Sequence, residues 1–109
     1  MSATTEEPTG SILSIDSIDG GLRISGQVDL SNADTFRNAV LAAAGGTPKL
    51  ALDLTDCSYM GSEGIGVLIE AVKALGQGRL VLRAPSGILL KVLDVAGLSK
   101  LPNVEISPG

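Results

Sequence analysis

The stretch Leu50–Gln77, LALDLTDCSYMGSEGIGVLIEAVKALGQ, decides the fold. Its beginning, Leu50–Leu54, is an apolar run typical of a buried strand, and a short polar link follows. Apolar residues then return with the spacing of one helix face, at Ile65, Leu68, Ile69, Val72 and Leu75. The pattern predicts a strand, a loop and a helix whose first turn carries Ser62. In α/β proteins such a junction is the usual place for functional groups.

Ser62 lies at the predicted start of this helix, in a glycine-rich segment. The first N–H groups of a helix have no partner within it, and the helix dipole adds roughly half a positive charge there, so phosphate is stabilised. Gly61, Gly64 and Gly66 leave room for another protein's active site to approach. Residue chemistry alone leaves a second interpretation open, in which Ser62 only caps the helix and the glycines allow tight strand–helix packing.

The residues around Ser62 lack the groups that an enzyme would need. A serine hydrolase requires a base, but the chain contains no histidine, and Met60 stands where a nucleophile elbow has its first glycine. No glycine-rich loop is followed by Lys-Ser or Lys-Thr, which excludes a P-loop. Scattered carboxylates and one cysteine predict neither a metal site nor a cofactor. Ser62 is therefore predicted to be a group acted upon, in a protein that is not an enzyme.

Three stretches, in the right order, resemble the STAS domain family of bacterial anti-sigma factor antagonists. Leu52–Gly66 is similar to the family signature, in which a Leu-Asp-Leu strand and a polar link lead to an Asp-Ser-Ser/Thr-Gly-Leu-Gly motif. Gly26–Leu30 resembles the earlier G-E-L-D motif, and Pro85–Leu98 resembles the last helix. The expected fold is α/β and STAS-like, a small mixed sheet of four to five strands with about three helices mainly on one face.

The resemblance implies a regulatory function. The unphosphorylated chain is expected to bind an anti-sigma factor that is also a serine kinase, which frees a sigma factor for transcription. The kinase would phosphorylate Ser62, a serine phosphatase would reverse this, and any nucleotide would be bound by the partner. The residues expected at or near the docking surface are Asp29, Ser31, Asn32, Tyr59, Met60, Gly61, Glu63, Gly64 and Gly66. For Asp29, a role as a turn and cap residue is an equal alternative.

Two positions depart from the signature next to Ser62. Gly61 replaces its Asp, and Glu63 replaces its second Ser or Thr. A fixed carboxylate beside Ser62 would repel an incoming phosphate, although exposure to water weakens the repulsion. These departures leave an alternative function open, in which a STAS subunit docks on a membrane transporter and is not phosphorylated.

The rest of the chain reads as one domain over residues 11–109, after a flexible polar tail, Met1–Gly10. Asp19–Gly21 predicts a hairpin turn between the first two strands. A first helix follows from Ser31 to Gly45, capped by Ser31 or Asn32 with Asp34 completing a capping box. The loop before this helix is expected near Ser62, because it also lies at a strand end.

Two helix surfaces allow alternative interpretations. On the central helix, Glu63, Gly66 and Glu70 continue into Lys73 and Gln77 as a polar stripe, either a solvated face with a Glu70–Lys73 pair or a partner-docking face. The third helix is apolar around most of its girth. This pattern favours deep packing there, with a homodimer or partner contact patch as the alternative.

Composition narrows the class of protein further. Hydrophobic residues make up 44% of the 109 positions but aromatic residues only 2%, so the core must consist of Leu, Val, Ile and Ala. The net charge of -4, without a basic cluster, argues against nucleic acid or anionic membranes as partners. Cys57 is the single cysteine and has no adjacent cation, which predicts a passive thiol without a disulfide. Without a signal peptide or membrane span, the predicted location is the cytoplasm.

Overall fold

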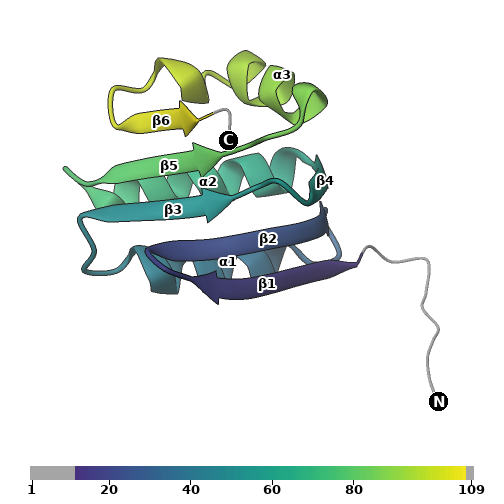
Figure 1. The fold of residues 1–109 in the computed structure, drawn as a ribbon, viewed down its shortest axis with the longest axis horizontal. Coiled ribbons are helices and arrows are strands. Elements are labelled where there is room, and N and C mark those ends of the chain that lie inside the picture. The colour runs from purple at the N-terminus through teal and green to yellow at the C-terminus, as the bar shows by residue number, and fades with distance from the viewer. Residues whose placement is uncertain (1–11, 108–109) are drawn as a thin grey trace.

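Parallel strands form the centre of the sheet. The computed structural model describes residues 12–107. In it, β3 (Lys49–Asp53) lies between β2 (Gly21–Val28) and β5 (Arg79–Arg83) and pairs with both in parallel (Figure 1). Three consecutive residues of β3, from Leu50 to Leu52, are buried. A continuous apolar run of this kind is typical of a central strand, paired with a neighbour on each side.

The two edges of the sheet are formed by the first and last strands. β1 (Leu13–Ile18) pairs antiparallel with β2 through the predicted hairpin turn, and β6 (Val104–Ser107) pairs in parallel with β5. The strand order is β1-β2-β3-β5-β6. The sheet is therefore mixed, as expected. The predicted tail, Met1–Gly10, lies outside the described residues.

One strand departs from the prediction. Residues Cys57–Met60, read from the sequence as part of a polar link, form β4, which pairs in parallel with the end of β2. Gly26 marks the irregularity at which this pairing shifts register. Its φ of +94°, and a position where a Cβ would lie 2.0 Å from the carbonyl oxygen of Ile12, require glycine. The prediction failed because long-range pairing, not local apolar alternation, forms this strand.

Two long helices cover one face of the sheet. α1 (Ala33–Ala44) and α2 (Ser62–Leu75) pack side by side behind the strands, whereas α3 (Gly87–Val95) and the short 3-10 helix η2 (Leu98–Lys100) lie at the edge near β6 (Figure 1). The core contains a single aromatic residue, Phe36, among aliphatic side chains. This agrees with the core composition expected from the sequence.

The start of α1 differs from the expected capping box. Asn32 is the N-cap, but its side chain makes no capping hydrogen bond. Instead, its Oδ1 accepts a hydrogen bond from the backbone N–H of Asp29, and its Nδ2 donates one to the carbonyl of Gln27. Asn32, one of the two predicted cap residues, is therefore the N-cap, but the predicted capping box does not form, because the Asn32 amide is bonded to Asp29 and Gln27 instead.

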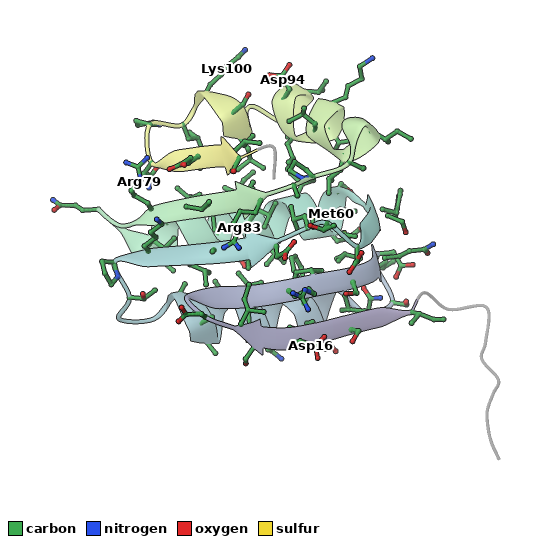
Figure 2. The ribbon with its side chains drawn as sticks, in the orientation of Figure 1. Asp16, Met60, Arg79, Arg83, Asp94 and Lys100 are labelled. Carbon is green, nitrogen blue, oxygen red and sulfur yellow. The ribbon has the colours of Figure 1, made fainter. Side chains whose placement is uncertain are left out.

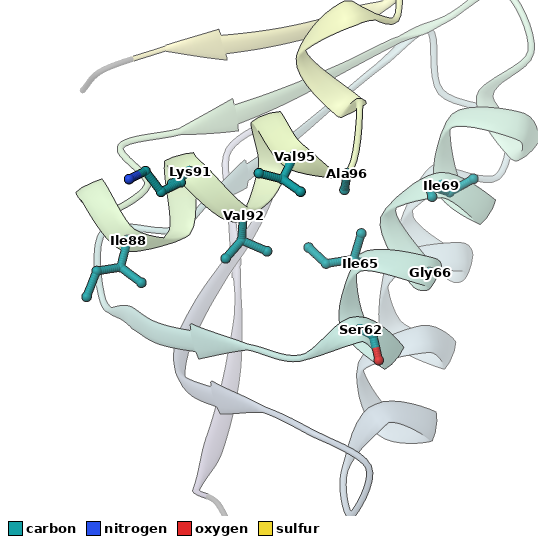
Figure 3. Close-up of a pocket in the computed structure, with 9 residues that line it drawn as sticks. All are labelled: Ser62, Ile65, Gly66, Ile69, Ile88, Lys91, Val92, Val95 and Ala96. Atoms are coloured by element: carbon teal, nitrogen blue, oxygen red, sulfur yellow. The ribbon is translucent and has the colours of Figure 1, made fainter.

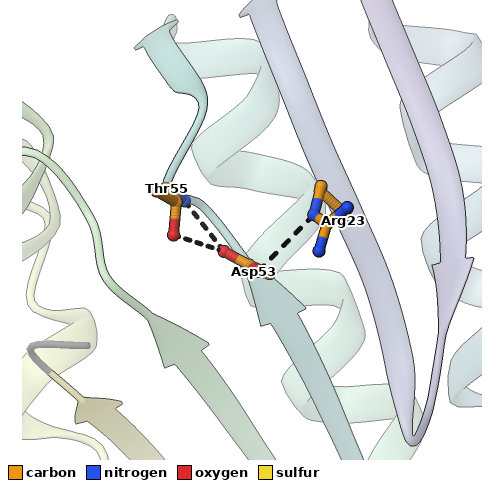
Figure 4. A network of polar contacts seen from close by, with 3 residues as sticks. All are labelled: Arg23, Asp53 and Thr55. Atoms are coloured by element: carbon orange, nitrogen blue, oxygen red, sulfur yellow. Dashed lines mark hydrogen bonds and ion pairs between the residues drawn. The ribbon is translucent and has the colours of Figure 1, made fainter.

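The other face of the sheet carries polar side chains (Figure 2). Arg23, Asp53 and Arg83 stand in one row across β2, β3 and β5. Asp53 Oδ1 accepts hydrogen bonds from Thr55 Oγ1 at 2.7 Å and Thr55 N at 3.0 Å, and Oδ2 lies 3.6 Å from Arg23 Nε (Figure 4). The Thr55 hydrogen bonds first, and then the neighbouring guanidinium groups, hold the pKa of Asp53 below its ordinary value.

Candidate functional site

Two strand ends meet beside Ser62. Val28, the last residue of β2, pairs with Met60, the last residue of β4, and the backbone N–H of Gly61 donates to the Val28 carbonyl at 2.9 Å. Asp29 follows Val28 directly, and Ser62 follows Met60 after one residue, Gly61. The loop before α1 and the start of α2 therefore lie at the same edge of the sheet, as the sequence predicted.

The Ser62 hydroxyl is free. Ser62 is the first residue of α2 and is exposed, and the preceding residue, Gly61, is the N-cap. Over residues 12–107, Ser62 Oγ makes no hydrogen bond, so it is not acting as a side-chain cap. A hydroxyl without an internal partner at a helix start is available to another molecule.

The loop before α1, in contrast, satisfies its own polar groups. Asp29 Oδ1 accepts hydrogen bonds from Ser31 Oγ at 2.6 Å and Ser31 N at 2.9 Å. Asn32 adds the two bonds described above. The loop is thus held in one shape, and it projects Leu30, whose side chain is 78% exposed. Sequence reasoning missed Leu30; an isolated leucine in a polar loop was the available signal.

The glycines of α2 were predicted either to allow tight strand–helix packing or to leave room for a partner, and the structure distinguishes two of them in this respect. A Cβ added to Gly64 would lie 2.5 Å from Met60 Cγ and 2.9 Å from Val28 Cγ1, so Gly64 serves tight strand–helix packing. Gly66 has open space around it. Met60 is only 3% exposed, which places its side chain, like Gly64, beneath the surface. These two residues were expected at or near the docking surface, and the structure places them beneath the exposed residues around Ser62.

The other predicted residues close to Ser62 are Tyr59, Gly61 and Glu63. Tyr59 is 53% exposed and Glu63 is exposed, whereas the backbone of Gly61 is covered. A Cβ added to Gly61 would lie 2.9 Å from Glu63 Oε1 and 3.3 Å from the Tyr59 hydroxyl. Both side chains therefore reach over Gly61.

An apolar groove of about 560 Å³ runs between α2 and α3, with Ser62 in its lining (Figure 3). One wall is α2 and the other α3, where Ile88 and Val95 are 79% and 82% exposed. Deep packing of α3 was the favoured prediction, and it is wrong, because only Leu89 and Leu93 of this helix are buried. The residues that line the groove are Ser62, Ile65, Gly66, Ile69, Ile88, Lys91, Val92, Val95 and Ala96.

A second depression lies between α1 and α2, on the other side of Ser62 and Gly66. It is lined by Leu30 from the loop and by polar groups of both helices. Arg37 Nε donates to Glu70 Oε1 at 2.7 Å across this depression. The ion pair of Glu70 is thus with α1, and the predicted Glu70–Lys73 pair is wrong. The start of α2 is flanked by an apolar groove on one side and a polar depression on the other.

Cys57 lies beneath this site without taking part in it. Its thiol is buried, and its Sγ lies 3.5 Å from the carbonyl oxygen of Tyr59. Burial raises the pKa of the Cys57 thiol above its ordinary value, which suppresses the reactive thiolate. The prediction of a passive thiol is confirmed.

Comparisons with known proteins agree with this fold. Residues 12–104 match the family model described as "Mlab, STAS domain", and the chain belongs to the STAS domain family. The anti-sigma-B factor antagonist of Bacillus subtilis (strain 168) is 29% identical over 86 residues, which cover 77% of this chain and 79% of that protein. The protein of the same name from Listeria monocytogenes is 43% identical over 61 residues, covering 51% of this chain and 54% of that protein.

Solved structures share the fold. An anti-sigma factor antagonist from Mycobacterium paratuberculosis superposes with a TM-score of 0.70 at 26% identity, covering 96% of this chain and 92% of that one. The phosphorylated form of the Bacillus cell fate determinant SpoIIAA gives a TM-score of 0.62 at 22% identity, over 87% and 90% of the two chains. Within residues 12–107, no helix has the length and apolar character needed to cross a membrane.

Proposed function

We propose that this chain is an anti-sigma factor antagonist, controlled by phosphorylation of Ser62. Its unphosphorylated form binds an anti-sigma factor with serine kinase activity and so releases a sigma factor. Membership of the STAS family and the names of its relatives in Bacillus and Listeria support this class of function. Those relatives are named for regulation and not for a catalytic activity.

The observation that carries the proposal is the free, exposed Ser62 hydroxyl at the edge of an apolar groove. Exposed apolar side chains gathered in one place mark a protein interaction site. The partner is proposed to cover Ser62 together with the α2–α3 groove and the loop before α1. Besides the groove lining, the exposed or half-buried residues that belong to this docking surface are Asp29, Leu30, Ser31, Asn32, Tyr59 and Glu63.

Phosphorylation is proposed to end the complex. The kinase transfers the γ-phosphoryl group of ATP: a bond forms between Ser62 Oγ and phosphorus, the bond to the β–γ bridging oxygen breaks, ADP leaves, and the hydroxyl proton is released. The phosphate adds about -1.5 to -2 charges at the helix start. In the free chain, water and the helix N-terminus stabilise this charge, so the domain stays folded.

The docked complex cannot tolerate the same charge. Among the described residues, Lys91 is the one charged side chain that lines the groove, and it lies on α3, across the groove from Ser62 (Figure 3). A phosphate enclosed there beside the Glu63 carboxylate adds negative charge that the contact does not neutralise, which costs several kcal/mol, enough to release the partner. Hydrolysis of the phosphoserine by a serine phosphatase resets the cycle. ATP is bound by the kinase partner in the cytoplasm, and this chain needs no cofactor.

A capture experiment tests the proposal. Wild type, Ser62→Ala, Ser62→Asp and the control Ser17→Asp are each checked for folding and used to capture partners from source-cell lysate, with identification by mass spectrometry. Ser17 is exposed and lies beside Leu22 near the hairpin turn, at the far end of β2 from Val28. Its variant therefore matches the added charge without touching the site.

The proposal predicts that wild type, Ser62→Ala and Ser17→Asp retain an anti-sigma factor with a kinase fold and that Ser62→Asp loses it. If all four chains retain the same membrane-transporter component, the transporter-subunit function holds instead. In that case Ser62 is not a phosphorylation switch, and the proposal is wrong.

A further inference from the structure

The space over Gly61 is filled by groups that belong to other residues. A side chain at this position would begin 2.9 Å from Glu63 Oε1 and 3.3 Å from the Tyr59 hydroxyl. Tyr59 comes from β4 and Glu63 from the first turn of α2, so the two converge from the strand and from the helix. The Glu63 carboxylate therefore stands where a side chain of residue 61 would be.

This placement is consistent with the local electrostatics. Gly61 offers no side-chain cap, and a negative charge in the first turn of a helix is favoured by the helix dipole. The ion pairs formed within the described part of the chain are Arg23–Asp53, Arg37–Glu70 and Arg79–Glu105. None involves Glu63, whose charge is thus not neutralised in the free chain.

Glu63 and Ser62 differ in this respect from the loop beside them. Asp29 and Ser31 are bonded to each other, whereas within residues 12–107 the Ser62 hydroxyl makes no hydrogen bond and the Glu63 carboxylate pairs with no cation. An exposed carboxylate and an exposed hydroxyl, adjacent and both without a protein partner among the described residues, form a pair that another protein can recognise together. The carboxylate would be matched by a cationic group of that protein.

We propose that Glu63 is a specificity-determining residue for the phosphorylation of Ser62. The inference rests on the proposed function, since it concerns how the kinase recognises its substrate. The kinase recognises a carboxylate that lies over Gly61. Glu63 provides this carboxylate, because Gly61 has no side chain that would occupy the same space. The STAS signature carries Asp at the position of Gly61, so the two departures from it compensate each other in space.

Exchanging the position of the carboxylate tests this inference. The initial rate of Ser62 phosphorylation is measured by mass spectrometry in source-cell lysate supplied with MgATP. Glu63→Gln removes the charge and keeps the shape, whereas Gly61→Asp with Glu63→Ala empties the place over residue 61 and returns a carboxylate to it from the other residue. Asp34→Asn, also an exposed acid at the start of a helix and in the depression beside Glu63, is the matched loss of charge.

The expected result is a fall of about fivefold for Glu63→Gln, the upper range for an exposed charge pair. The double variant recovers to within about twofold of wild type, and Asp34→Asn stays within the same range. The unfolding midpoint of each variant is measured as well, which separates a loss of recognition by the kinase from a loss of folding stability. Gly61→Asp adds a cap that stabilises the helix, which alone would not restore recognition in a chain that was already folded.

Each other outcome has a defined meaning. If wild type is not phosphorylated on Ser62, the proposed function and this inference both fail. If wild type is phosphorylated and Glu63→Gln is phosphorylated equally fast, only the inference fails. The inference also fails if Asp34→Asn slows the reaction as much as Glu63→Gln, because any nearby acidic residue would then be sufficient for recognition. It fails as well if the double variant does not recover the wild-type rate.

Discussion

Gly64 of α2 lies directly against the Met60 side chain of β4, so closely that a Cβ at residue 64 would stand 2.5 Å from Met60 Cγ. Two residues later, Gly66 has open space around it. Gly64→Ala should lower the free energy of unfolding by about 1–3 kcal/mol, because the added methyl group overpacks the contact. Gly66→Ala should raise it by about 1 kcal/mol, the helix propensity of alanine over glycine. Urea unfolding followed by circular dichroism measures both.

The two variants serve as controls for each other, since both replace a glycine of α2 with alanine. Changes of opposite sign in the free energy of unfolding would establish that packing requires glycine at residue 64 and that stability does not require glycine at residue 66. Stabilisation by both substitutions would mean that the contact between α2 and β4 is looser than described.

The wall of the α2–α3 groove should matter for partner binding more than other apolar positions of α3. Ile88 lines the groove and Leu90 does not, although both are exposed and lie near the start of the helix. Ile88→Asp should weaken capture of the anti-sigma factor about tenfold or more, because it places a charge in a desolvated contact. Leu90→Asp should leave capture within about twofold of wild type.

Both changes put an acid in the first turn of α3, where the helix dipole favours it, so neither should unfold the domain. Capture is measured as the concentration of each variant that half-saturates the immobilised partner. An equal loss for both variants would indicate that the whole of α3, and not the groove, faces the partner.

Asp53 should make stability depend on pH in acid. Its pKa is held below the ordinary value, first by the Thr55 hydrogen bonds and then by Arg23 and Arg83. The stabilisation is therefore present above the ordinary pKa of about 3.9 and is lost as the pH falls through the lower pKa of the folded state. Asp53→Asn should cost about 1 kcal/mol near neutral pH.

That cost should shrink as the pH falls below about 4 toward the lower pKa of the folded state, since the wild-type carboxyl becomes protonated and neutral like the amide. Urea midpoints over this range give the measurement. Asp56→Asn is the control, because Asp56 is exposed and three residues away. A pH-independent difference between wild type and Asp53→Asn would contradict the charged interaction.

Sequence periodicity predicted the elements that form locally or are buried on one regular face. The run around Leu52 and the helix after Ser62 are of this kind, as is the hairpin at Gly20. β4 was missed because its partner lies some thirty residues away, and nothing in four mixed residues shows that pairing. The exposure of Ile88 was missed for a related reason: an apolar helix shows no preferred face until its neighbours are placed.

The same division applies to the candidate site. Ser62 could be predicted from the strand–helix junction and from the resemblance, because both are properties of a continuous segment. The burial of Met60 and the reach of Glu63 over Gly61 could not, since they depend on side-chain directions set by the contact between β4 and α2. Leu30 was missed because its exposure follows from hydrogen bonds that fold the polar residues around it inward.

Cys57 offers a measure of how firmly the site is held. It is the first residue of β4, the short strand that leads into Ser62, and its buried thiol has a raised pKa. Alkylation in the native state at about pH 8 should be roughly a hundredfold or more slower than in urea, because the thiol must be exposed by opening before it reacts. Rapid native labelling would mean that β4 detaches from β2 without global unfolding. A partner that docks on Ser62 should then slow the labelling further, because binding stabilises the closed strand.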